Sequence, residues 1–66
     1  MPIIRVEIWK GISKEVKSEL ARTLTEDLAR IASKRPENII VVFNEYEQED
    51  WAIGGELSSN IDWSTR

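Results

Sequence analysis

The chain begins Met1-Pro2-Ile3-Ile4, which places a proline directly behind the initiator methionine. If Met1 is removed, the nitrogen of Pro2 becomes a secondary amine that can act as an acid or a base near neutral pH. If Met1 stays, that nitrogen belongs to an uncharged amide and does no acid–base chemistry. A second interpretation needs no chemistry, because a proline is tolerated at the start of an edge strand. These residues alone leave both interpretations open.

Few other side chains in the sequence could do chemistry. The chain has no cysteine and no histidine, which excludes disulfides and the usual zinc, copper or haem ligand sets. Four carboxylates lie between residues 45 and 50. An EF-hand loop alternates Asp and Asn around a required glycine, and this segment does not. We therefore interpret the segment as a solvated acidic loop and expect no metal and no cofactor.

The residues that follow Pro2 predict a β-strand over 3–9. Apolar and other residues alternate with period two, so that Ile4, Val6 and Ile8 share one face. This face is the predicted core face. The opposite face has a hydrophobic residue at each end and an Arg/Glu pair between them, a pattern that favours packing against another subunit.

A helix and a second strand are predicted next. Over residues 14–34 the apolar residues recur at spacings of four, four, four and three, which is typical of an amphipathic helix. Ser13 is a good N-cap for this helix, and Pro36 is expected to stop it. Residues 39–43 form a continuous β-branched run ending in phenylalanine, which predicts a strand. The order predicts an α+β fold built on a short βαβ unit with parallel strands and one long crossover helix.

The C-terminal third contains two predicted segments. Residues 51–57 place large apolar residues before the pair Gly54-Gly55, which predicts a short hairpin. Residues 58–66 form a mostly polar tail that contains Trp63. Because we see no local core for this tryptophan to enter, we expect the tail to dock on a neighbouring subunit.

Length and charge limit the class of protein. A chain of 66 residues is one domain, 1–66, whose own core is marginal without disulfides or a metal. Oligomerisation is the supplement left, and three tryptophans suit an interface. The net charge of -3, without a basic stripe, argues against nucleic acid as a partner. The N-terminal apolar run is too short to span a membrane, so we expect no membrane partner and a cytoplasmic location.

Three groups of residues resemble one known family in order and spacing. They are Pro2-Ile3, Gly11-x-Ser13 followed by a helix with Lys17 in its first turn, and Trp51-x-Ile53-Gly54-Gly55-Glu56-Leu57. Together they are similar to the 4-oxalocrotonate tautomerase family over residues 2 to about 58. The resemblance implies a βαβ subunit, a homohexamer, a small-molecule substrate, and the amino-terminal proline as catalytic base after loss of the methionine.

The resemblance also implies substrate-binding residues. Trp51 occupies the position of an aromatic residue that lines the family's site, Trp9 that of an apolar residue, and Ile53 that of a further wall residue. Such apolar walls would disfavour the charged ammonium and lower the pKa of the Pro2 amine. Plain interface packing is an alternative role for each of the three.

Two positions depart from the family pattern. Ile12 stands where the family commonly has an arginine that grips the substrate's carboxylate, and Ile40 stands near the position of a second arginine. A site lined by isoleucine offers no hydrogen bond to an oxo-acid and stabilises an enolate weakly. The cations could be replaced by Lys10, by Asn44 on the strand face of Ile40, or by Arg5.

The sequence thus predicts a tautomerase that moves a proton on a small enol or keto acid. The family fold also supports hydration, dehalogenation and decarboxylation, for which Glu7 or Glu45 would have to activate water. A third hypothesis is a non-catalytic ligand-binding or assembly module, which the missing arginines favour.

Overall fold

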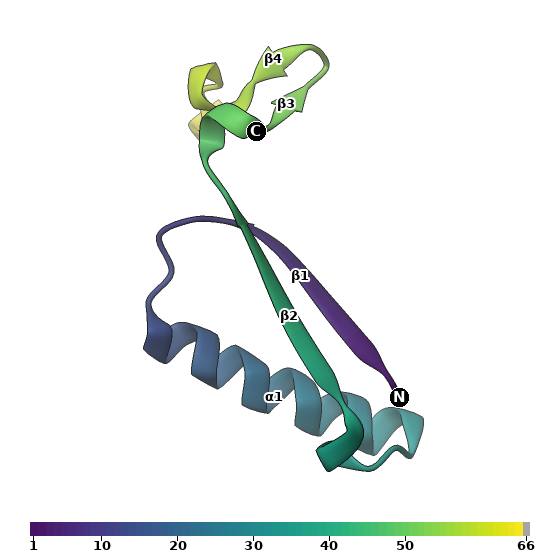
Figure 1. Ribbon diagram of the computed structural model, residues 1–66. Helices are drawn as coiled ribbons and strands as arrows, with labels where there is room; N and C mark the ends of the chain where they lie inside the picture. The colour runs from purple at the N-terminus through teal and green to yellow at the C-terminus, as the bar shows by residue number, and fades with distance from the viewer. Residues whose placement is uncertain (66) are drawn as a thin grey trace.

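A long helix crosses one face of a two-stranded sheet, and a small hairpin extends beyond the sheet in the computed structural model (Figure 1). The structure describes residues 1–65, so that the last residue of the predicted tail, Arg66, lies outside the described part. The strands are β1 (Ile3–Trp9), β2 (Ile40–Tyr46), β3 (Ala52–Ile53) and β4 (Glu56–Leu57), the helix is α1 (Lys14–Ala32), and short 3₁₀ turns are η1 (Pro36–Asn38), η2 (Gln48–Asp50), η3 (Ser58–Asn60) and η4 (Trp63–Thr65).

Strands β1 and β2 pair in parallel, which confirms the predicted βαβ unit. The register runs from Ile3 opposite Ile40 to Trp9 opposite Tyr46. In β1, the predicted core-face residues are half-buried, whereas Ile3, Arg5 and Glu7 on the other face are exposed. Helix α1 therefore covers the predicted core face, and the opposite face of the sheet is open in the single chain.

Strand β2 is longer than predicted, because two residues assigned to the acidic loop belong to it. Glu45 lies on the helix side of the sheet and forms an ion pair of 2.6 Å with Lys17 of α1. At Tyr46, the carbonyl oxygen accepts a hydrogen bond of 2.8 Å from the N–H of Lys10, which extends the ladder past β1. Partners that are distant in sequence thus keep both residues extended, and this part of the loop prediction is wrong.

Helix α1 begins as predicted and ends two residues early. The Ser13 hydroxyl accepts the Val16 N–H at 3.1 Å, which is the expected N-cap. At the other end, Ser33 adopts the left-handed conformation with φ 55°. The N–H of the following residue, Lys34, bonds back to the helix, which closes a C-cap before Pro36 is reached. Pro36 instead starts the turn η1, a position that tolerates its missing N–H.

The predicted hairpin is confirmed. Strands β3 and β4 pair antiparallel, with Ala52 opposite Leu57. Gly54 and Gly55 form the two-residue turn with φ values of 60° and 89°. Positive φ at both central residues is typical of the type I′ turn, whose twist matches that of a two-residue hairpin, and glycine adopts it without a steric penalty.

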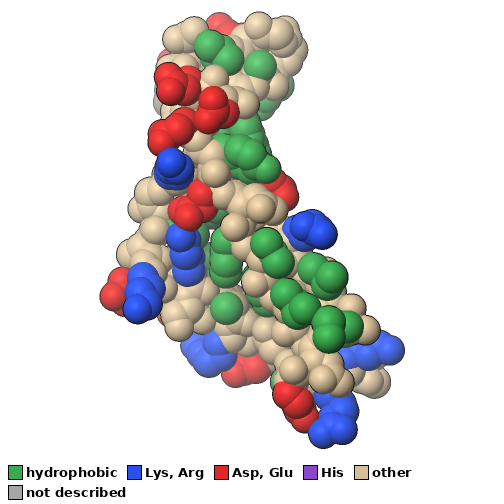
Figure 2. Space-filling view, in the orientation of Figure 1, with side chains coloured by type: hydrophobic (Ala, Val, Ile, Leu, Met, Phe, Trp, Pro, Cys, Tyr) green, Lys and Arg blue, Asp and Glu red, His purple; other side chains and the backbone are tan. Residues whose placement is uncertain are grey.

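The single chain does not enclose a core. Among residues 1–65, no hydrophobic side chain is fully buried, and Ile3, Ile31 and Ile40 are 52%, 71% and 40% exposed. The radius of gyration is 15.1 Å, against about 11 Å for a compact domain of this length. Hydrophobic side chains are visible on the surface in Figure 2. These features are typical of a subunit that completes its core in an assembly.

The described part of the chain, residues 1–65, has no helix that is both long and apolar enough to cross a membrane. The cytoplasmic location and the absence of a nucleic-acid partner stay predictions.

Candidate active site

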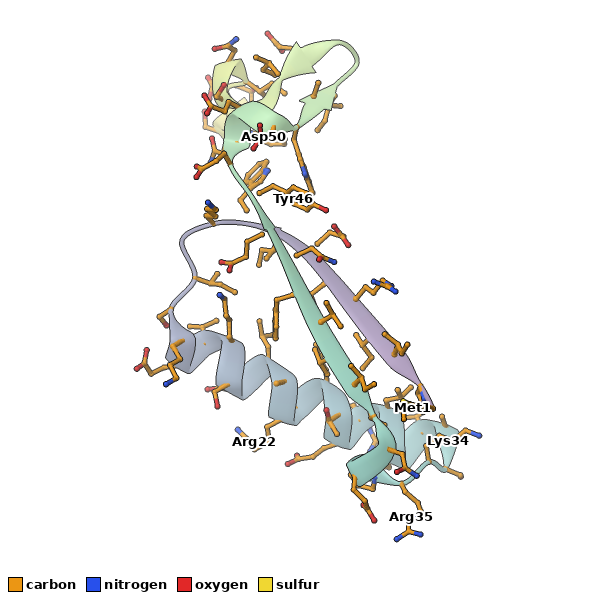
Figure 3. The ribbon with its side chains drawn as sticks, in the orientation of Figure 1. Met1, Arg22, Lys34, Arg35, Tyr46 and Asp50 are labelled. Atoms are coloured by element: carbon orange, nitrogen blue, oxygen red, sulfur yellow. The ribbon has the colours of Figure 1, made fainter. Side chains whose placement is uncertain are left out.

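Pro2 lies at the head of β1, next to the start of β2. Its carbonyl oxygen accepts a hydrogen bond of 3.0 Å from the N–H of Ile40. Pro2 is half-buried, whereas Met1 before it is 85% exposed. Figure 3 shows Met1 at the same end of the molecule as Lys34 and Arg35. The backbone of Pro2 is therefore fixed by the sheet, while the bond to Met1 lies at the surface.

An aromatic cluster lies at the other end of the sheet. The rings of Trp9 and Trp51 are 5.7 Å apart with an angle of 64° between their planes. The rings of Trp9 and Trp63 are 5.0 Å apart with an angle of 65° between their planes. Tyr46 adds a fourth ring, 5.7 Å from Trp51. We name these four residues the aromatic cluster. Trp63 therefore packs within its own chain, and docking of the tail on a neighbouring subunit stays a prediction.

Pro2 and the aromatic cluster are far apart in one chain. Trp9 is the seventh residue after Pro2 along an extended strand, which places the two about 23 Å apart at 3.3 Å per residue. Ile40 lies beside Pro2. Lys10 directly follows Trp9 at the far end of β1, and Ile12 lies two residues further on, ahead of α1. Within a single chain, therefore, Trp9 and the aromatic cluster do not line a pocket around Pro2.

Hairpin residue Ile53 shares the far end of the molecule with the aromatic cluster. It lies on β3, two residues after Trp51, and its side chain is 41% exposed. An exposed apolar side chain beside an aromatic cluster can contact a substrate or another subunit.

The open face of the sheet carries a hydrogen-bonded group that the sequence did not reveal. Glu7 accepts hydrogen bonds from the Tyr46 hydroxyl at 2.5 Å and from the Asn44 amide at 2.8 Å. These two bonds, that of Tyr46 foremost, lower the pKa of the Glu7 carboxyl, and the same bond raises the pKa of Tyr46. The register of the two strands, which places Glu7 opposite Asn44, is the information needed to find this group. Asn44 is thus occupied by a carboxylate from its own chain.

Lys10, another of the candidates to replace the missing arginines, is also paired. Lys10 contacts Glu47 at 3.1 Å, with both side chains more than half exposed. The hydrogen bond to Glu47, and then its negative charge, raise the pKa of Lys10. A lysine already neutralised by a carboxylate at the surface holds a substrate anion only weakly. Neither Lys10 nor Asn44 therefore stands ready as a carboxylate clamp.

Two further features of residues 1–65 bear on the site. No group of three or more acidic side chains in this part of the chain is placed to hold a metal ion. A hollow on α1 is lined by Val16, Glu19, Leu20 and Thr23, and none of these is a predicted site residue. The candidate site therefore consists of Pro2 and its neighbours at one end and of the aromatic cluster at the other.

Comparison with known proteins identifies the family of the chain. The family model described as "Tautomerase enzyme" matches residues 2–61. This chain belongs to the tautomerase family. A probable tautomerase of Streptococcus agalactiae is 40% identical to it over 57 residues, which cover 86% of this chain and 95% of the relative. A probable tautomerase of Dickeya dadantii is 35% identical over 57 residues, covering 85% of each chain.

Solved structures agree with this assignment and confirm the predicted fold class. The crystal structure of a 4-oxalocrotonate tautomerase homologue superposes with a TM-score of 0.83 at 34% identity and covers 94% of this chain and 98% of that one. A heterohexameric 4-oxalocrotonate tautomerase from Chloroflexus aurantiacus gives a TM-score of 0.86 at 26% identity, with 94% and 100% covered.

Proposed function

We propose that this tautomerase moves a proton on a small enol or keto-acid substrate, with Pro2 as the general base once Met1 is lost. The observation that carries the proposal is the position of Pro2. It is the first residue of the family match, its backbone is held against Ile40, and the exposed Met1 comes directly before it. A secondary amine in this position has a fixed direction and an accessible nitrogen.

The reaction requires a base that is neutral near pH 7. A free α-amino group has a pKa of about 7.7–8.0, and apolar surroundings lower it further because they disfavour the ammonium form. The neutral nitrogen takes the proton from the enol hydroxyl, and the resulting ammonium returns a proton to carbon as the keto form develops. No redox change and no cofactor are needed for this exchange.

The substrate pocket is proposed to form between subunits. Within one chain Pro2 and Trp9 are about 23 Å apart. The chain also leaves large apolar side chains exposed and encloses no core among residues 1–65. A homo-oligomer, which we propose to be a hexamer, would bring Pro2 of one subunit against Trp9, Trp51 and Ile53 of another. Such apolar walls would exclude water around the amine.

We propose that substrate binding depends little on contacts between the protein and a substrate carboxylate. Ile12 and Ile40 stand at or near the positions of the family's arginines. Of the three candidates to replace them, Lys10 is paired with Glu47 and Asn44 with Glu7. A dianionic oxo-acid would therefore lose its charge-assisted hydrogen bonds in this site. A substrate with one carboxylate and an apolar body fits the residues better.

Water activation by a carboxylate is less well supported. Glu7 accepts two hydrogen bonds that lower its pKa, and Glu45 is paired with Lys17 at 2.6 Å. The lowered pKa makes Glu7 a weaker base, and the ammonium of Lys17 occupies the carboxylate of Glu45, which argues against hydration and dehalogenation. The missing arginines favour a non-catalytic module instead, and that alternative is decided by an activity assay.

The assay follows ketonisation of the enol of phenylpyruvate. The protein is purified from its native source, and its intact mass is recorded to establish whether Met1 has been lost. We expect a mass lower by one methionine residue and a rate at neutral pH well above the rate in buffer. A rate equal to that of buffer, with Met1 lost, would leave the non-catalytic module as the better hypothesis.

A further inference from the structure

The chain continues past its family match with a well-bonded turn. The match ends at residue 61, and the turn η4 follows at Trp63–Thr65. Asp62 holds this turn, since its carboxylate accepts the N–H of Ser64 at 3.1 Å and the Ser64 hydroxyl at 2.5 Å. The hydroxyl bond, and then the N–H bond, lower the pKa of Asp62. The tail thus presents Trp63 from an ordered turn.

A single buried serine fixes the ring of Trp63. Ser58 is fully buried, and its carbonyl oxygen accepts the indole N–H of Trp63 at 3.0 Å. The N–H of Ser58 donates to the carbonyl of Trp51 at 2.8 Å, and its hydroxyl donates to the carbonyl of Gln48. Trp63 is therefore tied by a hydrogen bond to the same backbone that carries Trp51.

Trp9 has no comparable hydrogen bond. Its indole N–H is buried and finds no acceptor within residues 1–65. Its ring meets Trp51 at 5.7 Å and Trp63 at 5.0 Å, both in edge-to-face geometry. Packing against these two rings therefore sets the direction of Trp9. A hydrogen bond thus fixes the ring of Trp63, whereas the ring of Trp9 depends on its contact with Trp63.

We propose that Trp63 is a positioning residue that holds Trp9 in the substrate wall and so selects substrates with a flat aromatic body. This inference rests on the proposed function, because Trp9 is assigned to the wall there. A wall of edge-to-face indoles offers ring faces and edges to a planar π system and gains less from a small aliphatic group. The proposal adds a residue outside the family match to the site.

The test measures the binding, without turnover, of two flat unsaturated acids. Cinnamate and crotonate differ by a phenyl group in place of a methyl group, and their Kd values are measured by calorimetry. The variants are Trp63→Ala, Trp63→Phe, which keeps an aromatic ring, and the control Asn60→Ala, an exposed residue of the same tail. The indole N–H signals of the variants are compared by ¹H–¹⁵N NMR, and circular dichroism verifies that each variant is folded.

We expect the native protein to bind cinnamate more tightly than crotonate. Trp63→Ala should weaken cinnamate binding about two- to tenfold and leave crotonate unchanged, with a shift of the Trp9 indole signal. Trp63→Phe should keep most of the preference, and Asn60→Ala all of it. An unmoved Trp9 signal, an unchanged preference in Trp63→Ala, or no preference in the native protein would overturn the proposal. These outcomes do not depend on turnover, so they are distinct from a failure of the ketonisation assay.

Discussion

Replacing Pro2 with alanine is expected to lower kcat/KM for ketonisation of the enol of phenylpyruvate about a hundredfold, within the range for loss of a positioned general base. Alanine still leaves an amino group after loss of Met1, but that group is a primary amine. It also lacks the ring that locks the backbone dihedral φ of proline. The sheet bond between the Pro2 carbonyl and Ile40 can persist in the variant, so the loss should appear in kcat rather than in folding.

The chain supplies a matched control for this substitution. Pro36 is its second proline and starts the turn η1, where no chemistry is assigned to it. Pro36→Ala should therefore retain the native kcat/KM. A thermal unfolding curve verifies that this variant is folded. The intact mass of each variant must show loss of Met1, since a retained methionine would mimic the effect. Equal rates for the native protein and Pro2→Ala would remove Pro2 from the mechanism.

Introducing an arginine at Ile12 is expected to broaden the substrates toward diacids. Ile12 is half-buried in the segment between β1 and α1, at the same end of the molecule as Trp9. A guanidinium there can donate two parallel hydrogen bonds to a carboxylate. Hydrogen bonds to charged groups contribute about 1.5–3 kcal/mol, which predicts a gain of about ten- to a hundredfold in kcat/KM for 4-oxalocrotonate.

The gain should be specific to the position of the added charge. Ser18→Arg adds the same charge at an exposed polar residue of α1, and we expect it to leave kcat/KM unchanged for both substrates. Steady-state kinetics with 4-oxalocrotonate and with the enol of phenylpyruvate separate the two effects. A gain for both substrates in Ser18→Arg, or none for the diacid in Ile12→Arg, would mean that the missing arginine does not limit the native site.

The fold was predictable from the sequence because local patterns and tertiary structure agree. Period-two alternation in β1, helical periodicity in α1 and the pair Gly54-Gly55 each predict an element that the structure contains. The errors lie at element ends. Glu45 and Tyr46 are extended because of partners far away in the sequence, and such contacts leave no local signal. Ser33 ends the helix by a left-handed cap, which serine adopts less often than glycine.

The candidate site was predictable only in part. Pro2 is conspicuous in the sequence because of its position, and Trp9 and Trp51 follow from the resemblance to the family. The structure places Pro2 at one end of β1 and Trp9 and Trp51 at the other. The proposed pocket therefore lies at a boundary between subunits. The contact of Trp63 with Trp9 depends on the path of the tail through Ser58, which composition does not reveal.

The shared pocket is the central claim, and mixing two inactive variants tests it most directly. Subunits with Pro2→Ala and subunits with Trp51→Ala are co-expressed in equal amounts, purified as mixed assemblies, and assayed for ketonisation beside each parent. If each site takes Pro2 from one subunit and Trp51 from another, random mixing should restore about a quarter of the native sites. Activity of the mixture equal to the mean of the two parents would contradict a pocket built between subunits.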